Sequence, residues 1–107
     1  MQSADLHTSV TPAVAAILTQ LAETPDLDAA LRKVLSDYLV LKIGALSTEI
    51  RAFEEKWGMT FEEFSERAAA GSLPEDAFSY AVESDSWDWE RAVTLLRHYR
   101  ALEHRWI

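Results

Sequence analysis

The chain has 107 residues, the length of one domain, and its 26% charged and 49% apolar residues are an ordinary globular mixture. Eighteen Asp and Glu residues against ten Lys and Arg residues give a net charge of −8, which argues against non-specific binding to nucleic acid or to an anionic membrane. The absence of cysteine excludes a disulfide scaffold, a thiolate zinc site and a cysteine nucleophile. We therefore expect one acidic domain spanning 1–107.

The first ten residues are polar and lack the basic and apolar regions of a secretory signal, so we predict a flexible N-terminus over 1–10. The most apolar run, 38–46, is interrupted by Lys42 and has about half the length that spans a bilayer. These features predict a cytoplasmic protein that does not cross a membrane.

A first helix is predicted over 12–23. Thr11 followed by Pro12 is typical of a helix start. A threonine side chain caps the first turn, and the backbone N–H that proline lacks would have no partner within the helix at that position. Apolar side chains then recur on one face of this helix, at Val14, Ile17, Leu18 and Leu21.

A second helix is predicted over 25–57, from the Thr24–Pro25 start signal to a stop at Gly58. It would be roughly 48 Å long, whereas a compact domain of this size has a radius of gyration of about 13 Å. Either Gly44 bends this helix or another chain covers the part that protrudes, and we favour another chain. The segment 38–46 is apolar on nearly every side, which also indicates contact on more than one face. A heptad-like stripe that ends at Trp57 is therefore assigned to self-association, through Leu39, Ile43, Leu46, Ile50 and Phe53.

Two more helices complete the predicted fold. Thr60 and Glu63 fit a capping box for a helix over 61–70. A last helix over 86–106 carries the apolar residues Trp89, Ala92, Val93, Leu96, Tyr99, Leu102 and Trp106. The segment 75–83 fits either a short helix or an extended piece. The fold class is all-α, with a long helix packed against a C-terminal helix and shorter helices at the N-terminus and between them.

No arrangement of side chains in the sequence is typical of catalysis or of a metal site. His7, His98 and His104 do not have the spacing of metal ligands. Asp85 and Asp88 stand where an N-cap and a first-turn carboxylate would stabilise the start of the last helix. We therefore expect no catalytic residues, no cofactor and no bound metal, and a protein that is not an enzyme.

The acidic charge is concentrated in one aromatic-rich stretch. Residues 53–90 contain eleven acidic and two basic residues, a balance of −9, whereas residues 91–107 have a balance of +3. Trp87 and Trp89 are two residues apart, so on a helix they cannot both face the same core. Aromatic rings among carboxylates suit a basic partner protein, although these rings could instead cover the third helix. The candidate partner-binding residues are Phe78, Tyr80, Glu83, Asp85, Trp87, Asp88, Trp89 and Glu90.

Three segments carry a resemblance to a known family. They are Phe-Glu-Glu-Lys-Trp-Gly-Met-Thr-Phe-Glu-Glu-Phe at 53–64, Gly-Ser-Leu-Pro-Glu-Asp at 71–76 and Trp-Asp-Trp-Glu at 87–90. This pattern, within residues 50–102, resembles small prokaryotic helical proteins of the TumA-like antitoxin type. Trp57 stands where that family usually has tyrosine. The resemblance implies a non-catalytic protein that binds and neutralises a small toxin encoded beside it, and it implies no catalytic residues.

The expected function is an antitoxin-like module that binds a small basic toxin protein through the acidic aromatic stretch. The alternative is a homodimeric helical adaptor or assembly protein with no toxin partner. Sequence-specific DNA binding is disfavoured because the predicted helix 61–70 is acidic where a recognition helix would be basic. A carboxylate-dependent metalloenzyme is the remaining possibility, and no ligand spacing supports it.

Overall fold

The computed structural model describes residues 10–74 and 79–106, and these residues form helices joined by short connections, with no strand among them. The helices are α2 (Pro12–Ala22), α3 (Leu27–Trp57), α4 (Phe61–Ala70) and α5 (Tyr80–Trp106). The prediction of an all-α fold built on a long helix and a C-terminal helix is therefore confirmed. No helix in the described part of the chain is both long and apolar enough to cross a membrane.

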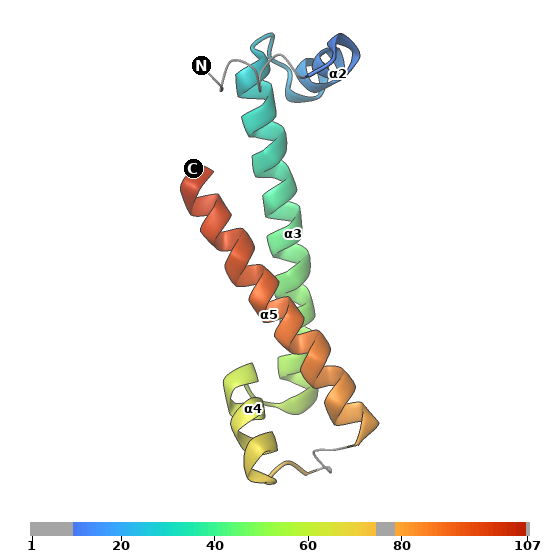
Figure 1. Cartoon of the computed structure of the whole chain (residues 1–107), viewed down its shortest axis with the longest axis vertical. Helices are drawn as coiled ribbons and strands as arrows, with labels where there is room; N and C mark the ends of the chain where they lie inside the picture. Colours follow the sequence, from blue (N-terminus) through green and yellow to red (C-terminus); the bar gives the residue numbers. More distant parts are fainter. Residues whose placement is uncertain (1–9, 75–78, 107) are drawn as a thin grey trace.

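The molecule is elongated around α3 (Figure 1). Helix α5 packs along the C-terminal half of α3, α4 lies beside the start of α5, and α2 crosses the N-terminal end of α3. The longest dimension is 57 Å and the radius of gyration is 20.1 Å, well above the roughly 13 Å of a compact domain of about 100 residues. Helix α3 runs through Gly44 as one continuous helix. The long helix is thus accommodated by an extended shape, with its N-terminal half covered only in part.

Local capping interactions set most helix ends as the sequence predicts. The backbone N–H of Val14 donates to the Thr11 side chain at the start of α2, and Gly58 ends α3 with a left-handed φ of 68°. At the start of α4, Thr60 N–H donates to Glu63 Oε1 at 2.9 Å and Glu63 N–H donates to Thr60 Oγ1 at 3.2 Å. The backbone hydrogen bond from Thr60 lowers the pKa of the Glu63 carboxyl below its ordinary value of 4.5, and the Thr60 hydroxyl adds to this effect.

The junction between α2 and α3 differs from the prediction by two residues. Glu23 adopts a left-handed φ of 57° and ends α2. The Asp26 carboxylate, rather than the Thr24 hydroxyl, caps α3, because it accepts the backbone N–H of Asp28 at 3.0 Å. Helix α3 therefore begins at Leu27, and the residues before it form the connection.

The core lies at the C-terminal end of α3, where α3, α4 and α5 meet. Its fully or nearly buried members are Phe64, Leu73, Val82 and Trp89. The Trp89 ring stacks on Phe53 at 5.5 Å and meets Phe61 and Phe64 at 5.5 and 5.0 Å between ring centroids. Offset and edge-to-face aromatic pairs of this kind stabilise a core beyond the area that they bury. One indole therefore joins the three helices.

The stripe assigned to self-association is used within the chain instead. Its members are Leu39, Ile43, Leu46, Ile50 and Phe53. Leu39 and Leu46 are buried, Ile43 is half-buried, and Ile50 and Phe53 pack against the core around Trp89. Helix α5 carries a complementary apolar stripe and packs along this side of α3. Leu39 and Leu46 are therefore covered within the single chain, which corrects their assignment to a dimer interface, while the assignment of the half-buried Ile43, Ile50 and Phe53 stays a prediction.

Candidate functional site

Helix α5 begins six residues before the predicted start. The Ser79 hydroxyl accepts the backbone N–H of Val82 at 3.3 Å, as an N-cap does, and the Val82 side chain is buried in the core. Residues 80–83 are therefore helical, which decides between the two conformations considered for this part of 75–83. Phe78, a predicted partner-binding residue, lies outside the described residues.

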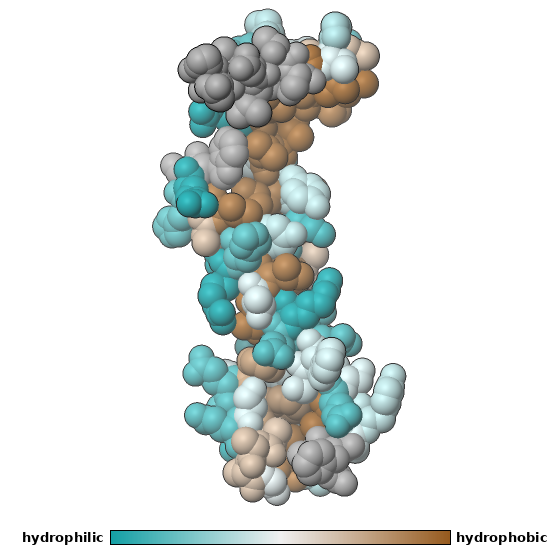
Figure 2. All heavy atoms as spheres, in the orientation of Figure 1, coloured by the Kyte–Doolittle hydropathy of each residue, from teal (hydrophilic) through white to brown (hydrophobic). Residues whose placement is uncertain are grey.

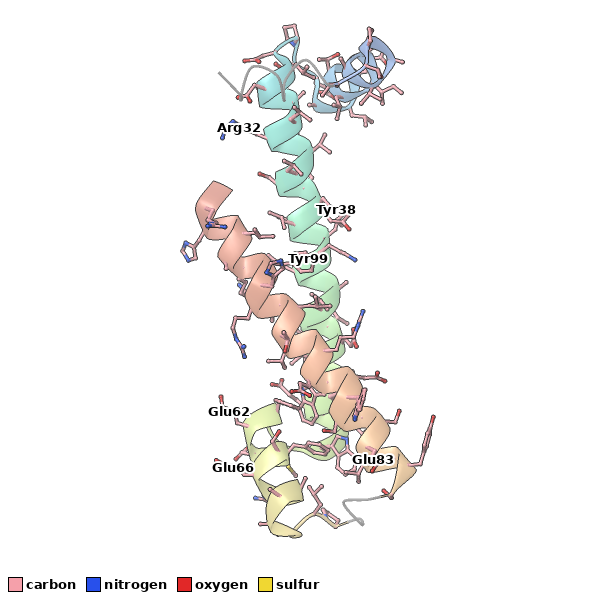
Figure 3. The ribbon with its side chains drawn as sticks, in the orientation of Figure 1. Arg32, Tyr38, Glu62, Glu66, Glu83 and Tyr99 are labelled. Atoms are coloured by element: carbon pink, nitrogen blue, oxygen red, sulfur yellow. The ribbon has the colours of Figure 1, made fainter. Side chains whose placement is uncertain are left out.

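The first turns of α5 carry an outward row of side chains that we call the α5 outer stripe: Tyr80, Glu83, Trp87 and Glu90. Their spacing of three, four and three residues places them on one face of the helix. Tyr80 is 86% exposed and Trp87 is 78% exposed. Figure 3 marks Glu83 near the start of α5. The structure thus brings four of the eight predicted partner-binding residues together on one surface.

The two neighbouring tryptophans have opposite positions. Trp89 is 0% exposed and lies at the centre of the core, while Trp87 projects from α5. The inference that only one of them can face the core is confirmed. The assignment of Trp89 to partner binding is wrong, because α3 and α4 cover its indole on the inner side of α5.

Open hollows flank the Trp87 indole on both sides along α5. One is lined by Tyr80, Glu83, Ser84, Trp87 and Asp88, and the other by Trp87, Glu90, Arg91, Thr94 and Leu95. Asp88, also predicted to bind a partner, borders the first hollow beside the outer stripe. A flat ring with open space on each side can be enclosed by a partner's side chains, which is how aromatic anchors contribute to interfaces.

The carboxylates around Trp87 are available for an external cation. Glu83, Asp88 and Glu90 are exposed, and none of them forms an ion pair with another described residue. Arg91 is directed to α3, where its guanidinium lies 3.9 Å from the Glu49 carboxylate. The outer stripe and its border therefore present three acidic groups without internal compensation.

Asp85 has a structural position rather than a partner-binding one. Its carboxylate accepts a hydrogen bond from Trp57 Nε1 at 2.9 Å and pairs with Lys56 Nζ at 2.6 Å. Its side chain is only 14% exposed. Asp85 thus ties the end of α3 to α5 and lies inside α5, so both its predicted cap role and its predicted partner role are corrected.

We expect Asp85→Ala to lower the free energy of unfolding by about 2 kcal/mol, because the half-buried Trp57 N–H loses its acceptor. Asp85→Asn keeps an acceptor oxygen and loses only the pair with an exposed lysine, so its expected loss is about 1 kcal/mol. Urea denaturation followed by circular dichroism measures both. Asp88→Ala is the control, with an expected change within about 0.5 kcal/mol. Equal losses for Asp85→Ala and Asp88→Ala would contradict this role.

The remaining acidic residues do not join the same surface. Glu62 and Glu66 lie along the outer side of α4, away from Glu83 on α5 (Figure 3). The balance of −9 over 53–90 is therefore divided between at least two surfaces, and the candidate site takes only the part on α5.

No group of three potential metal ligands occurs among the described residues. His98 and His104 are exposed on α5, and His7 lies outside the described residues. The exposed rings and unpaired carboxylates of the α5 outer stripe are suited to binding a cationic surface.

The chain was compared with known proteins, and it matches no family model, no curated protein sequence and no solved structure.

Proposed function

We propose that this chain is a non-catalytic, antitoxin-like module that binds and neutralises a small basic toxin protein encoded nearby, through the α5 outer stripe. The observation that carries the proposal is the 78% exposure of Trp87 among three carboxylates that have no ion-pair partner in the described part of the chain. The resemblance of 53–64, 71–76 and 87–90 to TumA-like antitoxins supports the toxin as the kind of partner.

The chemistry of the stripe favours a basic protein over other partners. Tryptophan and tyrosine are among the residues that most often dominate interface energetics, since each buries a large rigid surface at low conformational cost. Carboxylates at the border of such an anchor accelerate encounter with a positively charged partner and repel polyanions. A toxin that acts on RNA presents a basic surface, and an acidic binder placed on that surface would block access of the substrate.

The position of Trp87 indicates that its side chain contributes little to the stability of the fold. Its ring makes no aromatic contact with another described residue, whereas the neighbouring Trp89 makes three. Folding therefore gains little from an indole at this position. A binding role explains why a large apolar ring lies on the acidic side of α5.

The product of the neighbouring gene is the partner to test, by co-purification and by titration calorimetry with the purified chain. We expect Trp87→Ala to weaken binding by about 30-fold, the effect of losing a hot-spot residue worth about 2 kcal/mol. The melting temperature of the chain should change by less than about 2 °C, because little packing is lost. In cells, co-expression with the unmodified chain should relieve growth inhibition by the toxin.

A charge-reversal pair supplies the matched control. Glu90→Lys in the outer stripe should slow association and weaken its dependence on salt, while Glu62→Lys on α4 should leave both unchanged. Absence of binding by the unmodified chain would refute the toxin partner and leave the homodimeric adaptor as the alternative. A melting temperature that falls sharply in Trp87→Ala, with affinity intact, would make Trp87 a structural residue.

A further inference from the structure

Helix α2 has no charged residue and is apolar on more than one side. Its sequence, PAVAAILTQLA, has threonine and glutamine as its only polar residues. One side packs on α3 through the buried Ala22 and the half-buried Leu18. A second side exposes Val14, Ile17 and Leu21, which share one face as the sequence predicts. A surface helix ordinarily carries charged residues toward water, and a helix that is apolar all round is ordinarily buried.

Helix α3 continues this uncovered surface. Leu27, Leu31 and Val34 are half-buried on its N-terminal part, where α2 packs. The same row continues at spacings of four and three to Tyr38 and Leu41, and Leu41 is 71% exposed. Figure 3 shows Tyr38 on the side of α3 away from α5. Neither α2 nor α5 therefore covers this second row beyond Val34.

We name the α2–α3 face by its five exposed members: Val14, Ile17, Leu21, Tyr38 and Leu41. Figure 2 shows hydrophobic atoms running from α2 onto the N-terminal part of α3. The exposed fractions of these side chains correspond to roughly 500 Å² of surface, within the range of the largest apolar patch on a typical monomer. Two such faces in contact would bury about 1,000 Å² in total, the lower limit for a specific protein interface.

We propose that the α2–α3 face binds a second copy of this chain by two-fold symmetry. In a two-fold interface each face meets its own copy, so an uncharged face avoids like-charge repulsion. Helix α2 contributes no charge. On the nearby part of α3, Arg32 pairs with Asp28 at 3.0 Å and Lys33 pairs with Asp37 at 3.4 Å, while Lys42 Nζ lies over the Tyr38 ring, 5.7 Å from its centroid, at the border of the face. A basic partner would find no complementary charge here, in contrast to the α5 outer stripe.

The dimer leaves the proposed toxin-binding surface free. The start of α5 lies at the opposite end of the elongated molecule from α2 (Figure 1). A dimer would therefore present two outer stripes, one from each copy. Self-association through α2 and α3 does not depend on a toxin partner, and each proposal can fail without the other.

Glutamate substitutions in the full-length chain test the interface by sedimentation velocity over a range of concentrations. Ile17→Glu on α2 and Leu41→Glu on α3 each place two carboxylates in a two-fold interface. If each substituted side chain weakens dimer affinity about tenfold, the two copies together raise the dissociation constant on the order of 100-fold. Both side chains are already more than half exposed in the single chain, so far-UV circular dichroism should show unchanged helix content.

Val40→Glu is the matched control, because Val40 is 57% exposed on the same helix and the substitution changes the charge identically. Val40 lies about 200° around the helix from Tyr38, so it points away from the proposed interface. We expect Val40→Glu to dimerise like the unmodified chain. A chain that is still monomeric at about 100 µM overturns the proposal, because a specific interface of this size should then leave dimer detectable by sedimentation. A dimer that Ile17→Glu and Leu41→Glu leave intact overturns it equally.

Discussion

Trp89→Ala is expected to lower the free energy of unfolding by about 3–5 kcal/mol, the cost of removing a fully buried tryptophan side chain. Trp89 is fully buried, and its ring contacts Phe53 on α3 and both Phe61 and Phe64 on α4. Removing it leaves a cavity where three helices meet, and the surrounding rings are too large to fill it without shifting the helices. Urea denaturation followed by far-UV circular dichroism measures the loss without depending on tryptophan fluorescence.

Trp87→Ala is the matched control, since it removes the same side chain from the same helix two residues away. An exposed side chain without packing partners should change stability by no more than about 0.5 kcal/mol. Similar losses for the two variants would mean that α5 does not present Trp89 to the core in solution.

Trp89→Phe should cost less than Trp89→Ala for two reasons. Phenylalanine retains most of the ring contacts and leaves a smaller cavity. It also removes the buried Trp89 Nε1–H, which has no hydrogen-bond partner among the described residues. A buried donor without an acceptor costs about 1–3 kcal/mol, and that cost disappears with the indole nitrogen. A Phe variant as unstable as the Ala variant would contradict both reasons, because neither the retained ring contacts nor the loss of the unpaired N–H would then have stabilised the fold.

The parts of the fold that could be predicted depend on interactions within a few residues. Thr11 caps α2 and the Thr60–Glu63 pair caps α4, because each hydrogen bond closes within one turn of chain. Gly58 ends α3 for a similarly local reason. Such signals are complete in the sequence, so these ends of α2, α3 and α4 match their prediction.

The start of α5 could not be predicted in this way. Asp85 has the chemistry of a helix cap, but its partners are Lys56 and Trp57 on another helix. A contact across almost thirty residues leaves no local pattern. The cap is Ser79, whose position becomes clear only once Val82 is known to be buried.

The candidate site was predictable as a stretch and not residue by residue. Helix geometry establishes that Trp87 and Trp89 lie on different sides of α5. Which of them enters the core depends on where Phe53 and Phe64 arrive from α3 and α4. The sequence therefore indicates one exposed ring among carboxylates, and the tertiary packing identifies it as Trp87.

The two apolar rows of α3 also show what the sequence pattern predicts and what only the packing decides. A heptad row requires a partner, but its spacing is identical whether the partner is in the same chain or in another. The row through Leu39 and Leu46 is covered by α5 of the same chain. The row through Tyr38 and Leu41 remains uncovered, and contact on more than one face is what the apolar segment 38–46 predicts.

Leu46→Ala should lower the free energy of unfolding by about 2–5 kcal/mol, because Leu46 is buried in the contact between α3 and α5. Leu41→Ala, five residues earlier on the same helix, should leave the stability of the single chain nearly unchanged and weaken self-association instead. Urea denaturation of dilute protein measures the first effect, and sedimentation velocity measures the second.

These two substitutions remove the same atoms from the same helix, so only the identity of the covering partner distinguishes them. If α5 covers the Leu46 row, its loss is intramolecular, and the dimer dissociation constant of Leu46→Ala stays the same while the fold weakens. If another chain covered that row, Leu46→Ala would instead raise the dissociation constant and leave the dilute protein as stable as before. If Leu46→Ala weakened self-association and Leu41→Ala weakened the fold, the row from Leu39 to Phe53 would form the dimer interface and Leu41 would belong to the core of the single chain.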